Sequence, residues 1–115
     1  MAEVDVLEPP GDASGNGFSI THERHGTTAE IVVTGDLDIA TSPQLRHACA
    51  REQSDGAEVI LIDLSNVTFM DSTGLHALVT AYGDGDARVR IILSGAAARL
   101  IDLTGLRVRL PIVEG

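Results

Sequence analysis

Beyond the first sixteen residues, apolar positions alternate or recur at helical spacing, and this pattern predicts short strands and helices. The stretch 18–22 alternates apolar and polar residues, which predicts a half-buried strand, and 29–34 is rich in β-branched residues, which predicts a second strand. His25-Gly26 lies between them and suits a turn. The sequence therefore opens with a predicted β-hairpin.

Two helices are predicted from their start signals and their spacing. The first begins with Ser42 as N-cap and Pro43 at the first helical position, and ends at a Ser-Asp-Gly cluster. The second begins near Ser72 and ends at 83–86. Their apolar positions predict two buried faces: Leu45, Ala48 and Cys49 in the first, and Leu75, Leu78, Val79 and Tyr82 in the second.

Strands are predicted on both sides of the second helix. The nearly continuous apolar run 58–64 is typical of a strand covered on both faces, and 89–93 is another buried strand. A third helix spans 96–103 and stops at Gly105. The segment 108–113 is a predicted closing strand at a sheet edge, because a proline in it cannot donate to a central ladder.

The order β-β-α-β-α-β-α-β predicts an α/β fold with a mostly parallel sheet packed with helices, formed as one domain by residues 17–115. Periodicity leaves open whether the helices cover one face or both. Residues 1–16 carry four acids, two prolines and two glycines, which predicts a flexible acidic tail.

The composition of the chain excludes several classes of function. The 115 residues carry a net charge of −9, and all eight basic residues are Arg, so a P-loop lysine and a Schiff-base lysine are excluded. The acidic balance argues against a direct nucleic-acid partner. One cysteine forms no internal disulfide, no apolar run is long enough for a membrane span, and no basic leader opens the sequence. We therefore expect a cytoplasmic protein without a membrane partner.

Two segments at predicted strand ends could carry chemistry. These are 35–38 and 69–75, and functional loops lie beyond the carboxyl ends of strands in such sheets. Ser72 lies where a helix N-terminus would hold a phosphoryl group, and Gly74 would leave the turn open to a partner backbone. The structural alternative is that Asp71 or Ser72 merely caps the helix.

The carboxylates near these segments have two further interpretations. Asp36 and Asp38 suit turn positions, and together with Asp71 they could also bind a divalent cation.

Five segments together resemble a STAS domain, and the bacterial anti-sigma-factor antagonists most of all. The resemblance runs from about Phe18 to Val113. The segments are GDLDIAT at 35–41, LR at 45–46, IDLS at 62–65, FMDSTGL at 69–75 and RLIDLTGL at 99–106.

The resemblance implies partner switching. The unphosphorylated antagonist binds an anti-sigma factor that is also a serine kinase, which frees the sigma factor. Phosphorylation at the position of Ser72 releases the complex, and a serine phosphatase resets it. The same resemblance places Asp71 and Thr73 beside this serine, and Asp36 and Asp38 on the loop that borders it. We expect these residues to contact the partner together with two neighbours on the predicted helix, Gly74 and His76. It implies no cofactor. A STAS subunit of a larger signalling scaffold, or an accessory STAS subunit of a lipid or anion transporter, are the alternatives.

Other chemistry finds little support in the sequence. His22, His25 and His47 show no metal-ligand spacing with Cys49, so no metal site is expected. A serine hydrolase needs a G-x-S-x-G elbow followed by an acid and a histidine, and the segment around Ser72 does not have this pattern. We therefore expect no enzyme.

His76 stands where the family usually has a small residue. It follows Ser72 by four residues on a helix, so it is either a plain exposed histidine or a partner for a phosphoserine.

Overall fold

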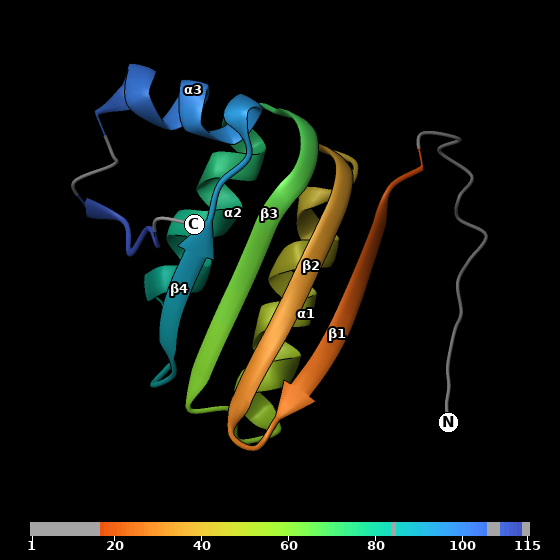
Figure 1. Cartoon of the computed structure of the whole chain (residues 1–115), viewed down its shortest axis with the longest axis vertical. Helices are drawn as coiled ribbons and strands as arrows, with labels where there is room; N and C mark the ends of the chain where they lie inside the picture. The colour runs from red at the N-terminus through yellow and green to blue at the C-terminus, as the bar shows by residue number, and fades with distance from the viewer. Residues whose placement is uncertain (1–16, 84, 106–108, 114–115) are drawn as a thin grey trace.

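The computed structural model describes residues 17–83, 85–105 and 109–113, and these form one mixed sheet with helices packed on it (Figure 1). The predicted tail, 1–16, lies outside the described residues. The strands are β1 (Ser19–His25), β2 (Thr28–Leu37), β3 (Val59–Met70) and β4 (Arg88–Ile92). The helices are α1 (Ser42–Ser54), α2 (Ser72–Gly83) and α3 (Gly95–Thr104).

The sheet confirms the α/β class expected from the sequence. The strand order is β1-β2-β3-β4, with β1 antiparallel to β2 and the other neighbours parallel. The hairpin is present, with the turn at 26–27. Its first strand is more exposed than predicted, since Ile20 is the only residue of β1 that is even partly buried.

The helices α1 and α2 lie on one face of the sheet, and the other face of the strands carries no described helix (Figure 1). Burial along β2 alternates strictly for this reason. The prediction that the run 58–64 is covered on both faces is wrong: Ile60 and Ile62 are fully buried, whereas Val59 and Leu61 are only partly covered. Because side chains alternate along a strand, these two residues lie on the face of the sheet opposite to Ile60 and Ile62.

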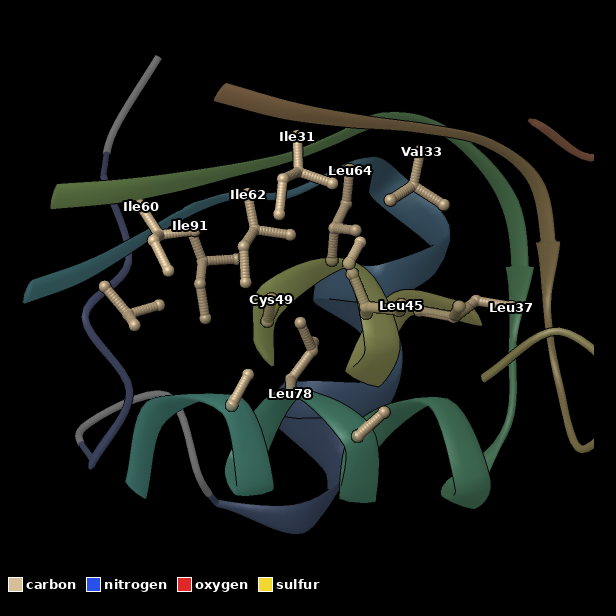
Figure 2. Packing of buried hydrophobic residues seen from close by; sticks show 14 of the residues in the cluster. Ile31, Val33, Leu37, Leu45, Cys49, Ile60, Ile62, Leu64, Leu78 and Ile91 are labelled. Carbon is tan, nitrogen blue, oxygen red and sulfur yellow. The ribbon is translucent and has the colours of Figure 1, made fainter. Parts of the chain in front are cut away.

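The core lies between the sheet and the helices. Figure 2 shows isoleucines of β2, β3 and β4 directed toward the buried positions of α1 and α2. The predicted core residues of α1 are confirmed as buried: Leu45, Ala48 and Cys49. Fully burying one large aliphatic side chain such as Leu45 contributes about 1.5–3 kcal/mol to stability.

The buried face of α2 differs from the predicted one. Leu75 and Leu78 are buried, but Val79 is 40% exposed. The helix instead buries Ala77 and Ala81, small residues that let it pack close to its neighbours. The prediction assigned Val79 to the inward face because its side chain is large and apolar, whereas the inward face of α2 includes the smaller alanines.

Helix starts also differ from the prediction. The N-cap of α1 is Thr41, and Ser42 is the first helical residue. The third helix follows the expected pattern, with the Ser94 hydroxyl accepting the Ala97 N–H at 3.1 Å and Gly105 ending it in the left-handed conformation, φ 75°. Within the described residues, no helix is long and apolar enough to cross a membrane.

The expected closing strand, 108–113, is reduced to one bridge between Ile112 and Ile91 of β4; Val108 lies outside the described residues. Ile91 donates its N–H to the carbonyl of Pro111 at 2.9 Å. The proline therefore lies at the sheet edge, as its missing donor requires.

Edge strand β1 is tied to α1 by charged side chains. Glu52, 8% exposed, accepts from His22 Nδ1 at 2.8 Å and from Arg24 at 3.0 Å. Arg24 also donates to the carbonyl of Asp55 at 3.0 Å. These contacts hold the hairpin against the helix layer through hydrogen bonds to a nearly buried carboxylate.

Candidate functional site

The site is built where β2 and β3 end side by side. The N–H of Asp71 donates to the carbonyl of Leu37 at 3.3 Å, which joins the start of α2 to the end of β2. Both strands run further than the sequence predicted, so Asp36 and Phe69 are paired residues of the sheet rather than loop residues. The two predicted segments nevertheless meet at one edge, because β2 and β3 are parallel.

Asp71 is the cap of α2. Its Oδ1 accepts the backbone N–H of Thr73 at 2.9 Å and of Gly74 at 3.2 Å, and it also accepts the Thr73 hydroxyl. The bond from that hydroxyl, with those from the backbone, holds the pKa of the Asp71 carboxyl below its ordinary value. The structural alternative considered from the sequence is therefore confirmed for Asp71.

Ser72 occupies the first turn of α2 with an exposed side chain. Its hydroxyl forms no hydrogen bond with any of the residues that the structure describes. That the helix N-terminus holds a phosphoryl group here stays a prediction. In this structure the N–H groups of Thr73 and Gly74 donate to Asp71, so a phosphoryl group could receive them only in place of that carboxylate. A group added to Ser72 would lie next to a carboxylate and face outward.

Gly74 has a different role from the one the sequence suggested. It is buried, and a Cβ added to it would lie 2.6 Å from the carbonyl oxygen of Leu37 and 2.8 Å from Cγ of Met70. The close approach is therefore between α2 and its own sheet, not between the turn and a partner. Any larger residue would push the start of α2 away from β2 and displace Ser72.

The acidic residues after β2 shape the turn into α1. Asp38 Oδ1 accepts the N–H of Ala40 at 3.0 Å and of Thr41 at 3.2 Å, while the Thr41 hydroxyl donates to the carbonyl of Asp36 at 2.7 Å. Asp36 Oδ1 accepts the hydroxyl of Thr68 at 3.0 Å. The turn interpretation is confirmed for Asp38.

The cation group of Asp36, Asp38 and Asp71, which the sequence left open as an alternative, does not form. Over the part of the chain that the structure describes, these three carboxylates do not converge on one position. Each instead accepts hydrogen bonds from its own local loop or strand.

The outer surface of α2 carries one exposed stripe: Ser72, His76 and Val79, spaced by four and three residues. Two further apolar side chains are exposed at the same end of the sheet, Ile39 at 75% and Phe69 at 50%. Val79, Ile39 and Phe69 were missed from the sequence, because each was assigned to a core face or passed over as part of a motif.

The comparisons with known proteins agree with this architecture. The STAS domain family matches residues 19–111. This chain belongs to the STAS domain family. The anti-sigma-B factor antagonist of Staphylococcus aureus is 36% identical over 90 residues, which cover 75% of this chain and 83% of that protein. The family resemblance expected from the sequence is thereby confirmed.

Solved structures show the same fold. The crystal structure of an anti-sigma factor antagonist from Mycobacterium paratuberculosis superposes on this STAS chain with a TM-score of 0.79 at 29% identity, and covers 88% of this chain and 89% of its own. The Bacillus cell fate determinant SpoIIAA in its phosphorylated form gives a TM-score of 0.63 at 20% identity, over 84% of this chain and 92% of its own. At that identity the likeness concerns the fold alone.

Proposed function

We propose that this STAS protein is an anti-sigma-factor antagonist that acts by partner switching, with Ser72 as its switch. Its relatives that carry this name match it over most of their own length. That match, over 83–88% of the length of these relatives, supports an antagonist over a subunit of a scaffold or of a transporter. These relatives are named as regulators, not as enzymes.

The observation that carries this proposal is that Thr73 and Ser72 have different roles at the start of α2. The Thr73 hydroxyl donates to Asp71, whereas the Ser72 hydroxyl is exposed and unengaged among the described residues. A kinase can therefore reach Ser72 without breaking the helix cap. Phosphorylation of Thr73 would remove one hydrogen bond to the cap and place a phosphate against the Asp71 carboxylate.

The proposed docking surface combines charge and apolar area. It consists of the α2 stripe (Ser72, His76 and Val79) together with Ile39, which lies between β2 and α1 at the same end of the sheet. In the unphosphorylated state an anti-sigma factor packs on the two apolar residues. Phosphate adds about −1.5 to −2 charges next to Asp71, and both the repulsion and the cost of desolvating the phosphate weaken that contact. A serine phosphatase then restores binding. Gly74 acts here by bringing α2 close, while Asp36, Asp38 and Thr73 border the surface.

The test uses the partner anti-sigma factor with its serine kinase activity and ATP. We expect phosphate on Ser72 by mass spectrometry, none on Ser72→Ala, and unchanged phosphorylation of Thr80→Ala, which alters another hydroxyl on α2. Ser72→Ala should bind the partner like the wild type. Ser72→Asp should bind at least about tenfold more weakly, since one buried unpaired charge costs well over 1.4 kcal/mol.

Two results would overturn this proposal. The first is phosphate found mainly on Thr73. The second is a Ser72→Asp variant that binds the partner as tightly as the wild type while it is folded by circular dichroism.

His76 extends the proposal. If its imidazole pairs with the phosphoserine one turn away, its ring proton signals in the NMR spectrum should move on phosphorylation while those of His47, exposed on α1, stay in place. Unmoved His76 signals would leave it as an ordinary exposed residue of the docking surface.

A further inference from the structure

The tip of the β1–β2 hairpin gathers three side chains that can ligate a metal ion. Glu23 and His25 are two residues apart on β1, so they point to the same face of the sheet. Glu30 lies directly opposite Glu23 on β2. His25 Nε2 is 3.4 Å from Oε1 of Glu23 and 3.9 Å from Oε1 of Glu30. One oxygen or nitrogen donor from each residue falls within 4.8 Å of the others.

These distances suit a small tetrahedral ion. With metal–ligand bonds of about 2.0–2.2 Å, two ligands of tetrahedral zinc are separated by about 3.4 Å. The His25–Glu23 separation has this value already. The His25–Glu30 separation exceeds it by about half an ångström. Glu30 and the exposed His25 can close that gap by rotating their side chains.

The charges at the hairpin tip also favour a bound cation. Two glutamates directly opposite each other on neighbouring strands repel and destabilise the pairing. Among the described residues, the only ion-pair partner of either carboxylate is the His25 ring. The nearest arginine along β1, Arg24, points to the other face and bonds to Glu52. A divalent cation would neutralise the two carboxylates and bind the imidazole nitrogen at once.

We propose that Glu23, His25 and Glu30 form a binding site for a divalent transition-metal ion of the zinc class. A nitrogen ligand with two carboxylates favours Zn²⁺ over Mg²⁺, which requires octahedral oxygen coordination. The three side chains leave a fourth position open to water. The ion joins β1 to β2 at the turn and stabilises the edge strand.

The sequence did not predict this site, because its histidines show no metal-ligand spacing with Cys49. The site needs a residue from each of two strands, and it is assembled only by the cross-strand register of Glu23 with Glu30.

The site is separate from the docking surface. It lies at the start of β2, whereas Ser72 lies beyond the end of this strand, and a ten-residue strand separates the two ends by about 30 Å. The proposal therefore does not depend on partner switching.

The experiment is calorimetric titration of the full chain with Zn²⁺ in a non-chelating buffer, with Mg²⁺ as the comparison ion. We expect one Zn²⁺ per chain and no Mg²⁺ binding at the same concentration. His25→Ala and Glu30→Gln should each weaken zinc binding at least about tenfold. His47→Ala removes an exposed histidine of α1 and serves as the matched control, with unchanged affinity.

A thermal melt gives the second readout. Zinc should raise the Tm of the wild type and of His47→Ala, and leave that of His25→Ala unchanged. Without metal, Glu30→Gln should melt above the wild type, because it removes the repulsion from Glu23. No zinc binding to the wild type, or equal binding by wild type and a folded His25→Ala, would overturn the proposal. Partner binding by His25→Ala should stay as in the wild type, so failure here and failure of the proposed function are distinguishable.

Discussion

The Asp71 carboxylate accepts the backbone N–H of Thr73 at 2.9 Å, so the helix that carries the proposed phosphorylation site is capped by the residue before that site. The serine between them contributes nothing to the cap. Stability and signalling are therefore assigned to adjacent residues, and they can be separated by mutation.

Asp71→Ala should lower the free energy of unfolding by about 0.5–2 kcal/mol, the usual effect of losing an N-cap side chain. Ser72→Ala should change it by about 0.5 kcal/mol or less, because its hydroxyl is exposed. Urea denaturation of both variants measures the difference. A Ser72→Ala variant as unstable as Asp71→Ala would contradict the assignment of the cap.

The stabilisation from Asp71 should depend on pH. Its pKa is lowered in the folded state, so its contribution is fully present above the unfolded value of about 3.9 and is lost as the pH falls through the folded pKa. Asp71→Asn does not titrate. The difference in free energy of unfolding between wild type and Asp71→Asn should therefore shrink on acidification below about pH 4. A difference that stays constant or grows would show that the carboxylate charge does not act in the cap.

Glu52 should be the most sensitive charged residue of α1. Glu52→Gln keeps the shape of the side chain but removes the charge that His22 and Arg24 contact, and we expect a loss of about 1–3 kcal/mol. Glu58→Gln is the matched control. Its carboxylate is exposed, with one hydrogen bond of 3.4 Å from Thr27, and it should cost about 0.5 kcal/mol or less. Equal losses in the two variants would show that net charge, not the contact with β1, decides the effect.

The Cys49 thiol should be unreactive in the folded protein. Burial, with a smaller contribution from the nearby Glu52 charge, raises its pKa to about 12, so the thiolate is scarce at neutral pH. A thiol reagent should label it only as fast as the protein opens, and rapidly in urea. The control places an exposed thiol next to it, as Ala50→Cys in a Cys49→Ala background. Fast labelling of native Cys49 would contradict its buried position.

Removal of residues 1–16 should leave both the Tm and the affinity for the partner unchanged. Their composition, rich in acid, proline and glycine, predicts that they add nothing to the core. The comparison is a melt and a binding titration of residues 17–115 against the whole chain. A lower Tm or a weaker complex would assign the tail a structural or regulatory role.

Local features of this fold could be predicted from sequence because they arise between near neighbours along the chain. The hairpin turn, the proline in the first turn of α1 and the left-handed stop at Gly105 depend on backbone preferences of single residues. The motif around Ser72 likewise marked the candidate site and the family. The order of strands and helices followed from these signals.

Only the tertiary structure decided which surfaces are covered and which side chains meet. The helices α1 and α2 pack on one face of the sheet, which leaves Leu61 partly exposed on the other face. The helix α2 buries two alanines on its inward face, and Val79 lies on its outer face. Gly74 is needed because β2 passes 2.6 Å from where a Cβ would lie, a contact between residues 37 apart along the chain. The pairing of Glu23 with Glu30 is likewise a product of strand register. Such contacts join residues that are distant along the chain and depend on how the elements pack together. A local hydrophobic pattern does not specify that packing.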